Sequence, residues 1–342
     1  MSAGGGRGAA GARPRAAGGA PVRLGVVMDP IGGIQIAKDS TFAMLLAAQA
    51  RGWELRYMEL GDLWLEGAQA RARMRPLAVR DDPRGWYELG DAEEAPLAAL
   101  DVVLMRKDPP VDLEYLRATW ILERAEAEGV LVVNAARALR NADEKLWTAW
   151  FADLAPPFVV AREPARIEAF LEREGEIVLK PLGRMGGQGV FYLRRDDPNR
   201  PVVIETVTDH GRRFCMAQRF VPEIRTGGDH RILLVDGEPV PYALARVPRA
   251  GEVRGNLAAG GRAEGVALDA RERAICARLG PVLRREGLLF VGIDVIGGWL
   301  TEINVTSPTC IRELDALYGL DIAGRLMDAI GRRLSRRGER PA

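Results

Sequence analysis

The residues best suited to chemistry lie near the C-terminal end of the chain, in two adjacent strand patterns. The run 290–304 carries Asp294, Glu302 and Asn304 among apolar residues. Side chains on a strand alternate between its two faces, so Glu302 and Asn304 share one face. Three oxygen-bearing side chains without histidine or cysteine suit Mg²⁺ bridged to a nucleotide. The pattern therefore predicts a metal site, with an idle, solvated hairpin face as the alternative.

The register of this hairpin decides whether Asp294 joins the other two side chains. A two-residue turn at 297–298 would place Ile293 opposite Glu302 and mix polar with apolar residues. A three-residue turn at 297–299 places Asp294 opposite Glu302, and the hydrophobic pattern favours this register. The apolar positions then pair as Val291 with Val305, Ile293 with Ile303, and Val295 with Thr301.

A glycine-rich run, Lys180-Pro-Leu-Gly-Arg-Met-Gly-Gly-Gln-Gly189, lies between two apolar strand patterns. Glycine lets the backbone approach phosphate oxygens, and successive N–H groups can form an anion nest. The run differs from a P-loop because its lysine precedes the glycines and no helix follows. It differs from a dinucleotide fingerprint because both flanks are strands. We expect a β-hairpin flap over phosphates, with a plain glycine hairpin as the alternative.

Lysine is rare in this chain. Of 48 basic residues only four are lysines, namely Lys38, Lys107, Lys145 and Lys180. Lysine is a compact point charge and arginine a planar fork, so positions that keep lysine are candidates for sites that need the smaller cation. Arg231, Arg246 and Arg254 follow the glycine-rich run and are candidate partners for phosphate or carboxylate. We interpret both histidines, His210 and His230, as structural or solvent-exposed.

Alternating strand and helix patterns predict a small α/β domain at residues 22–140, with a parallel sheet covered on both faces. A helix is expected over 143–154, followed by a linker at the two prolines 156–157. Beyond them, short strands and turns indicate an antiparallel α+β region. The polar, glycine-rich segment 248–262 is typical of a mobile functional loop.

Composition excludes several classes of protein. The apolar fraction of 47% with 28% charged residues is that of an ordinary globular chain, and the net charge of +1 gives no field that would attract nucleic acid or membranes. No apolar run is long enough to span a bilayer. The three cysteines lie far apart and favour a reducing cytoplasm. Residues 1–21 are expected to form a disordered tail, and residues 332–342 a frayed one.

Several runs taken in order resemble prokaryotic glutathione synthetases, which belong to the ATP-grasp superfamily. These runs are Val27-Met-Asp-Pro-Ile31, Lys38-Asp-Ser-Thr-Phe42, Met105-Arg-Lys-Asp-Pro-Pro110, Asn141-Ala-Asp-Glu-Lys145, Arg254-Gly-Asn-Leu-Ala-Ala-Gly-Gly261 and Leu300-Thr-Glu-Ile-Asn304. The resemblance implies an ATP-grasp fold, of mixed α/β and α+β class, with an N-terminal parallel-sheet (pre-ATP-grasp) domain. It divides the chain into a substrate domain at 22–140, a central subdomain with the flap at 141–221, and a C-terminal subdomain at 222–331 with the metal site and a lid at 248–262.

The resemblance also implies roles for particular residues. The ATP phosphates would be contacted by Lys145, Lys180 and Arg231, and the flap would contain Gly186, Gly187 and Gln188. The adenine pocket would be lined by Gln218, Phe220 and Val221. The metal ion, Mg²⁺ or Mn²⁺, would be held by Asp294, Glu302 and Asn304. The flap run departs from the bacterial pattern at Arg184 and Gly189. We expect Arg231 and Arg246 to steady the transferred phosphoryl group or the oxyanion. For the peptide substrate and the lid we propose Lys38, Asp39, Ser40, Arg106, Lys107, Arg254 and Asn256.

The implied reaction joins γ-L-glutamyl-L-cysteine to glycine through an acyl phosphate, with ATP cleaved to ADP and phosphate. Because such a reaction needs no protein nucleophile, the lack of a Ser–His or Cys–His pair is consistent with it. The resemblance suggests a homo-oligomer without nucleic-acid or membrane partners. The alternatives are another ATP-dependent carboxylate–amine ligase and, in a different class, a non-catalytic nucleotide-binding module.

Overall fold

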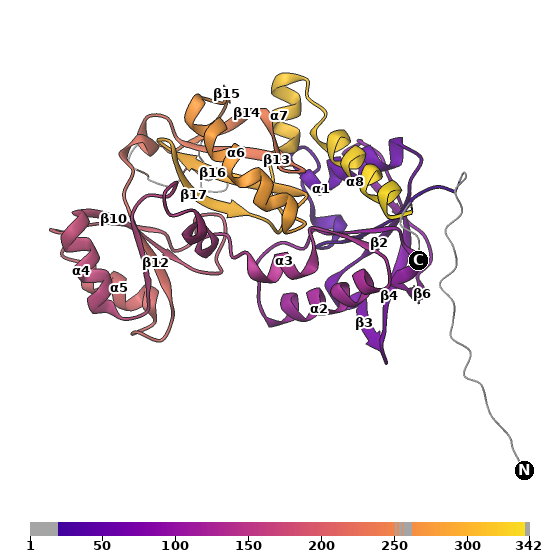
Figure 1. Cartoon of the computed structure of the whole chain (residues 1–342), viewed down its shortest axis with the longest axis horizontal. Helices are drawn as coiled ribbons and strands as arrows, with labels where there is room; N and C mark the ends of the chain where they lie inside the picture. The colour runs from indigo at the N-terminus through magenta and orange to yellow at the C-terminus, as the bar shows by residue number, and fades with distance from the viewer. Residues whose placement is uncertain (1–19, 250–251, 253–254, 256–261, 339–342) are drawn as a thin grey trace, which may run out of the picture.

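We describe the protein from a computed structural model in which residues 20–249, 252, 255 and 262–338 are described. These residues form three β-sheets, and the C-terminal sheet lies between the other two (Figure 1). Most of the expected tail at 1–21, most of the expected lid at 248–262 and residues 339–342 lie outside the described residues.

The N-terminal sheet has the strand order β3-β4-β2-β1-β7-β8, with β5 and β6 paired to β4. Its parallel part consists of β1 (Arg23–Val27), β2 (Glu54–Met58), β7 (Val102–Met105) and β8 (Leu131–Val133). Its antiparallel part consists of β3 (Leu63–Glu66), β4 (Gln69–Val79), β5 (Tyr87–Leu89) and β6 (Glu93–Pro96). The prediction of a parallel sheet is therefore wrong for strands β3 to β6. The strictly alternating run 69–75 forms the long strand β4, which pairs antiparallel with its neighbours.

Helices cover both faces of the parallel strands, as the sequence predicted. Leu24 and Val26 of β1 share one buried cluster with α1 (Ser40–Ala50) and α8 (Ile322–Gly338). Val27 and the alternate residues of β7 share another cluster with α2 (Leu113–Ala127) and α3 (Ala136–Asn141). The period of two along each strand thus divides the apolar residues between two cores. Helix α8 continues to Gly338, past position 332 where we expected a frayed tail to begin.

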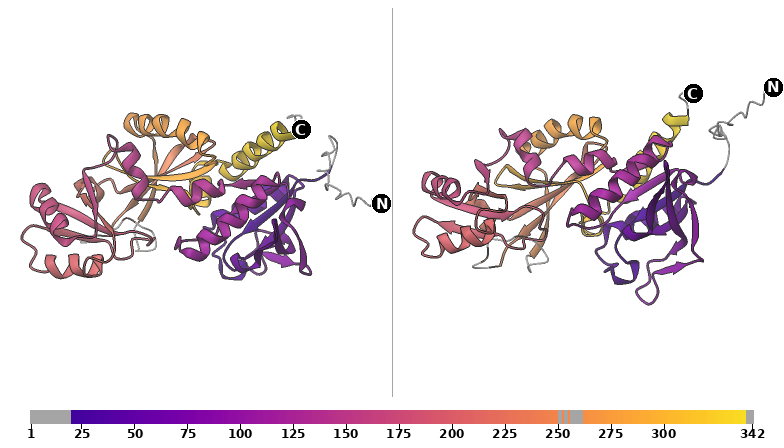
Figure 2. Two further views of the ribbon diagram at one scale, coloured as in Figure 1. Left: turned by 60° about the horizontal axis from the view of Figure 1, so that its bottom comes forward. Right: turned by 90° about the horizontal axis from the view of Figure 1, so that it is seen from below.

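The central sheet has the order β11-β10-β12-β9 and is covered by two helices (Figure 2). Its elements are β9 (Phe158–Ala161), α4 (Pro164–Glu174), β10 (Glu176–Pro181), β11 (Phe191–Arg194), α5 (Arg200–Thr208) and β12 (Cys215–Arg219). Strands β10 and β11 pair antiparallel and enclose the glycine-rich run, so the predicted β-hairpin is confirmed.

The C-terminal sheet is wholly antiparallel in the order β15-β14-β13-β16-β17. Its elements are β13 (Asp229–Val235), β14 (Glu238–Val247), β15 (Arg262–Ala267), α6 (Ala270–Arg285), β16 (Phe290–Ile296) and β17 (Trp299–Asn304), followed by α7 (Ile311–Tyr318). Residues of α6 share one buried cluster with β16, β17 and the helices α2 and α3, so the N-terminal and C-terminal sheets are joined by a continuous core.

The helix predicted over 143–154 is wrong: the segment forms only a short 3₁₀ helix, η4 (Leu146–Phe151). Asp143 accepts hydrogen bonds from the N–H groups of Lys145 and Leu146, at 3.0 and 2.8 Å. On either side of the 3₁₀ turn the chain pairs with β17, since Ile303 N donates to Glu144 O and Leu300 N donates to Leu154 O. Other 3₁₀ turns are η1 (Ile31–Gly33), η2 (Leu60–Asp62), η3 (Leu97–Ala99) and η5 (Pro222–Arg225).

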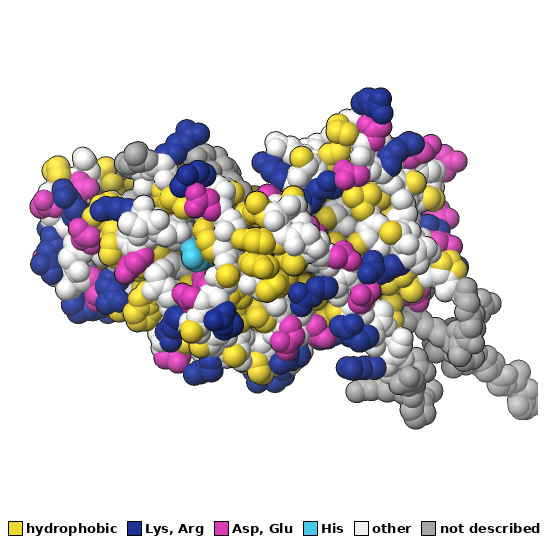
Figure 3. Space-filling model, turned by 90° about the horizontal axis from the view of Figure 1, so that it is seen from above, with side chains coloured by type: hydrophobic (Ala, Val, Ile, Leu, Met, Phe, Trp, Pro, Cys, Tyr) yellow, Lys and Arg dark blue, Asp and Glu magenta, His cyan; other side chains and the backbone are white. Residues whose placement is uncertain are grey.

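Charges of both signs are interspersed over the face drawn in Figure 3. In the part of the chain that the structure describes, no helix combines the length and the apolar character that a membrane crossing requires.

Candidate active site

A cleft lies between the central and C-terminal sheets, and most of the predicted ATP- and metal-binding residues line it. The flap and β10 contribute one wall, β12 and the residues after it contribute a second, and β17 contributes the third. The lining includes Lys145, Lys180, Gly186, Gly187, Gln218, Phe220, Val221, Arg231, Glu302 and Asn304. Residues that are far apart in the sequence therefore meet in one place.

The β16–β17 hairpin places Asp294 opposite Glu302 and Ile293 opposite Ile303, as predicted. The turn itself is different, because Ile296 pairs with Trp299 across the two-residue turn 297–298. A bulge after Asp294 restores the register, so Val295 lies opposite Leu300 and not opposite Thr301. An extra residue in one strand shifts the pairing by one position, an arrangement that turn length alone does not reveal. Asp294 and Glu302 share a face because directly paired residues do so.

Asp294 is buried behind the cleft wall and is held by two arginines. Its Oδ1 accepts from Arg231 Nε at 2.5 Å, and its Oδ2 accepts from Arg231 at 3.0 Å and lies 2.9 Å from a guanidinium nitrogen of Arg246. Burial would raise the pKa of Asp294, but the two positive charges outweigh it and hold this pKa well below its usual range. Arg246 also contacts Asp229 at 2.5 Å. The four residues form a buried ionic cluster.

Asp229 is a site residue that the sequence analysis missed. It lines the cleft, and its second carboxylate oxygen, Oδ1, is buried without a hydrogen-bond partner among the described residues. Burial raises its pKa to about 6, even though Arg246 acts in the opposite direction. Its position directly before His230, at the start of a strand pattern, carried no signal beyond an acidic residue at a strand end.

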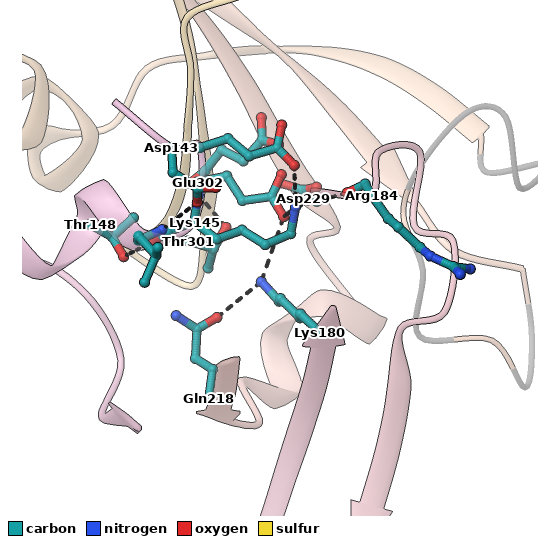
Figure 4. Close-up of polar contacts among 12 residues, drawn as sticks. Asp143, Lys145, Thr148, Lys180, Arg184, Gln218, Asp229, Thr301 and Glu302 are labelled. Carbon is teal, nitrogen blue, oxygen red and sulfur yellow. Dashed lines mark hydrogen bonds and ion pairs between the residues drawn. The ribbon is translucent and has the colours of Figure 1, made fainter. Parts of the chain in front are cut away.

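One end of the cleft contains two lysines and two glutamates, and Figure 4 shows both lysines beside Glu302. Lys145 contacts the carboxylate of Glu144 and donates to the backbone oxygen of Arg184 in the flap at 3.0 Å. Lys180 donates to Gln218 Oε1 at 3.1 Å. The ammonium groups of both lysines lie 3.9 Å from Glu302 Oε1.

Glu144 is a second residue that the sequence analysis missed. Burial and the negative charge of Glu302 raise its pKa to about 7, while Lys145 acts in the opposite direction. Burial alone would lower the pKa of Lys145, but the two carboxylates raise it above its usual value. Glu144 directly precedes Lys145, and this adjacency was the only available signal in the sequence.

The flap is formed by backbone conformations that favour glycine. Gly186 and Gly187 have φ angles of 65° and 76°, in the left-handed region that other residues rarely adopt. Gln188 N donates to Met185 O at 3.2 Å and so closes a turn. The consecutive glycines leave backbone N–H groups without side chains between them and the cleft, which is the arrangement an anion nest requires.

The opposite end of the cleft has an aromatic wall. The ring of Phe220 lies 4.6 Å from that of Tyr192, and the guanidinium of Arg225 lies 4.9 Å from the Phe220 ring. Gln218 Nε2 is buried and has no hydrogen-bond partner among the described residues. An apolar ring wall beside a free amide donor can accept a planar base with acceptor nitrogens.

The candidate peptide-binding residues lie at the N-terminal end of α1 and after β7. Asp39 caps α1 by accepting from Phe42 N at 2.6 Å, and burial raises its pKa. Ser40 accepts from Ile311 N at 3.1 Å, so it bonds to the first residue of α7. Lys107 pairs with Asp29 at 2.8 Å.

The remaining candidates differ in exposure. Lys38 is exposed to solvent, whereas Arg106 is buried. Arg106 donates to Thr41 Oγ1 and to Pro308 O, both at 3.0 Å, and so connects α1 to the loop after β17. Arg254 and Asn256 lie outside the described residues.

Two family models match the chain. The N-terminal domain of prokaryotic glutathione synthetase matches residues 22–140, and the ATP-grasp domain of prokaryotic glutathione synthetase matches residues 144–319. The glutathione synthetase of Salmonella typhimurium is 56% identical over 315 residues, which cover 92% of this chain and 100% of that protein. The glutathione synthetase of Shewanella oneidensis is 56% identical over 313 residues, covering 92% and 99% of the two chains.

Solved structures agree on the fold. The D-cycloserine synthetase DcsG superimposes with a TM-score of 0.64 at 16% identity, covering 91% of this chain and 99% of that chain. An ATP-grasp ligase of Chryseobacterium gregarium superimposes with a TM-score of 0.62 at 13% identity, covering 94% and 100%. The predicted ATP-grasp fold is thereby confirmed. With both of its domains matched and more than half of its residues identical to those of curated relatives, the chain belongs to the prokaryotic glutathione synthetase family of ATP-grasp ligases.

Proposed function

We propose that this enzyme joins γ-L-glutamyl-L-cysteine to glycine and cleaves ATP to ADP and phosphate. Family membership supports the reaction. The observation within the molecule that carries it is the meeting of Lys145, Lys180 and Glu302, from three separate segments, at one end of a cleft with an aromatic wall at the other. Two ammonium groups and a carboxylate suit the triphosphate of a nucleotide and its bound cation, and the aromatic wall suits its base.

The chemistry proceeds in two transfers. A carboxylate oxygen of the dipeptide attacks the γ-phosphorus, the bond to the β-phosphate oxygen breaks, and ADP leaves with that electron pair. The amine of glycine, after losing a proton, then attacks the acyl carbon, and phosphate leaves. Catalysis consists mainly of positioning and charge stabilisation. We assign the phosphate contacts to Lys145, Lys180 and the flap residues Gly186, Gly187 and Gln188.

For the nucleotide base we propose the pocket formed by Gln218, Phe220 and Val221. The unpartnered amide of Gln218 supports this assignment, because a buried donor without a partner is costly unless a ligand supplies the acceptor. The same amide uses its oxygen to hold Lys180, so one side chain would contact the base end and steady a phosphate-binding lysine.

The donor set Asp294, Glu302 and Asn304 fits a hard divalent cation, which we propose to be Mg²⁺ or Mn²⁺. Asn304 Nδ2 is buried without a hydrogen-bond partner among the described residues, so no hydrogen bond from this nitrogen fixes the orientation of the amide. Both oxygens of Asp294 accept from arginine, but each carboxylate oxygen has two lone pairs. A cation bound there would neutralise phosphate charge. Among the described residues, no group of three or more His, Cys, Asp or Glu is placed to hold a metal ion, so this set depends on the amide of Asn304 as its third donor.

Arg231 and Arg246 are our candidates for stabilising the phosphoryl group and the oxyanion. Their pairing with Asp294 and Asp229 keeps both guanidinium groups buried beside the cleft. For the dipeptide we propose Lys38, Asp39, Ser40, Arg106 and Lys107. Because Arg106 donates a hydrogen bond to the loop after β17, we propose that it acts on the dipeptide by positioning this loop.

Measurement of ADP release tests this function directly. We expect release that depends on γ-glutamylcysteine and is completed by glycine. If D-alanine or glutamate replaces glycine as the effective amine, the alternative carboxylate–amine ligase is supported. Nucleotide binding without any turnover, with either substrate present, would leave only the non-catalytic module.

Three further proposals rest on the family resemblance. We propose a cytoplasmic enzyme, which the buried, unpaired thiols of Cys215, Cys276 and Cys310 support. We propose a homo-oligomer, which sedimentation velocity would test. We also retain the division into a substrate domain at 22–140 and ATP-grasp subdomains at 141–221 and 222–331.

A further inference from the structure

The two lysines at the phosphate end of the cleft are each held by a separate side chain. Lys145 is bonded to the carboxylate of Glu144. Lys180 is bonded to the amide oxygen of Gln218 (Figure 4). Both ammonium groups stay 3.9 Å from Glu302, outside hydrogen-bond distance. Glu302 thus carries a negative charge between two cations without accepting a hydrogen bond from either.

This arrangement matters because Glu302 is a proposed ligand of the divalent cation. A lysine ammonium has three donors and no fixed plane, so it turns toward whichever carboxylate is nearest. Without Glu144, the nearest remaining carboxylate to Lys145 among the described residues is that of Glu302. Lys145 is 4% exposed, so little water is available to take the place of the lost carboxylate. A direct lysine–glutamate bond would then compete with the cation.

The position of Glu144 relative to Glu302 is fixed by the backbone. Glu144 O accepts from Ile303 N at 2.8 Å, and Ile303 lies between Glu302 and Asn304 on β17. Asp143 Oδ1 accepts from Lys145 N at 3.0 Å and fixes the residue that follows. The glutamate that holds the lysine and the glutamate that it protects therefore belong to two backbone segments that are directly hydrogen-bonded, the turn at 143–145 and strand β17.

We propose that Glu144 is a positioning residue that holds Lys145 away from Glu302 and so keeps Glu302 available to a divalent cation. The inference deepens the proposed function and rests on the cation site assigned there. It distinguishes the two lysines, because the partner of Lys145 is charged while that of Lys180 is a neutral amide. Removing the charge of Glu144 should therefore change cation binding and leave the binding of glycine unchanged.

The test is a titration of the purified, full-length Glu144→Gln variant with Mn²⁺, with and without ADP. Electron paramagnetic resonance measures the concentration of free Mn²⁺ at each step of the titration. We expect the dissociation constant of Mn²⁺ to rise about tenfold, which corresponds to about 1.4 kcal/mol. The free Mg²⁺ concentration at half-maximal ADP release should rise in parallel, while the KM of glycine stays within twofold. Unchanged Mn²⁺ affinity would overturn the proposal.

A second measurement separates positioning from direct ligation. In a Lys145→Met background, Glu144→Gln should cause no further loss of Mn²⁺ affinity, because Glu144 acts only through Lys145. An equal loss in both backgrounds would mean that Glu144 is itself a ligand and would overturn the proposal. Glu126→Gln is the matched control, since Glu126 is a partly buried glutamate that accepts from Ala136 N, far from the cleft. This control should bind Mn²⁺ like the wild type.

Two failures remain distinguishable. A wild-type enzyme without glycine-dependent ADP release would reject the proposed function, whereas the Mn²⁺ titration would still report on the cation site. If Glu144→Gln does not fold, Glu144→Asp replaces it, because the shorter side chain withdraws the carboxylate from Lys145 and should weaken Mn²⁺ binding in the same direction. Wild-type affinity in Glu144→Asp would then count against the proposal.

Discussion

The buried ionic cluster around Asp294 allows stability and catalysis to be separated. In Asp294→Asn, Arg246 keeps its ion pair with Asp229, whereas Arg231 loses its only ion pair among the described residues, and all four groups are almost completely buried. Removing one partner of a buried ion pair costs about 3–5 kcal/mol, because the remaining charge is left uncompensated. Asp229 offsets part of that cost, so we expect about 3 kcal/mol, or roughly a 100-fold change in the unfolding equilibrium.

The assay is unfolding in urea without nucleotide or metal, monitored by tryptophan fluorescence. Glu302→Gln is the control, because Glu302 makes only 3.9 Å contacts and its side chain is 20% exposed. We expect that control to lose less than about 1 kcal/mol, the range of a partly exposed pair. Both variants should lose activity. If Asp294→Asn were as stable as Glu302→Gln, the reasoning that Asp294 organises the two arginines would be refuted.

Three other predictions follow from the site. Glu302→Ala should lower turnover at least about 100-fold through lost electrostatic stabilisation, and steady-state ADP release near the wild-type rate would remove this residue from the site. Phe220→Ala should raise the KM of ATP about tenfold and leave the KM of glycine unchanged, because only the base pocket loses its ring contact with Tyr192. The bond between His230 and Glu272 raises the pKa of the imidazole above 6.5. The stabilisation of the folded state by this bond is therefore complete below pH 6.5 and is lost as pH rises through the raised pKa of His230. The Tm of the wild type should fall between about pH 6.5 and 8.5, and the Tm of Glu272→Gln should fall less.

The sequence predicted the pairing within the β16–β17 hairpin better than it predicted the turn. Apolar alternation placed Asp294 opposite Glu302 correctly, but through a turn of the wrong length. The bulge near Thr301 compensates for the shorter turn, and a bulge has no composition signal of its own because it depends on pairing between strands.

The N-terminal half shows the same limit. Periodicity predicted the parallel strands and the helices that alternate with them. It did not reveal β3 to β6, because the antiparallel insertion interrupts the expected alternation of strand and helix. At the site, Glu144 and Asp229 were missed because their importance comes from partners that are distant in the sequence, namely Glu302 and Arg246. Burial and long-range charge are properties of the assembled fold.

The backbone bonds between the segment 144–154 and β17 have a consequence for product release. They attach Lys145 to the C-terminal sheet, while Lys180 belongs to β10 of the central sheet. A rotation of the central sheet about the connections between the sheets would therefore carry one cation away from the other. If both lysines bind the polyphosphate as proposed above, the two ammonium groups would then separate, and the nucleotide would be released without any side chain having to change its rotamer.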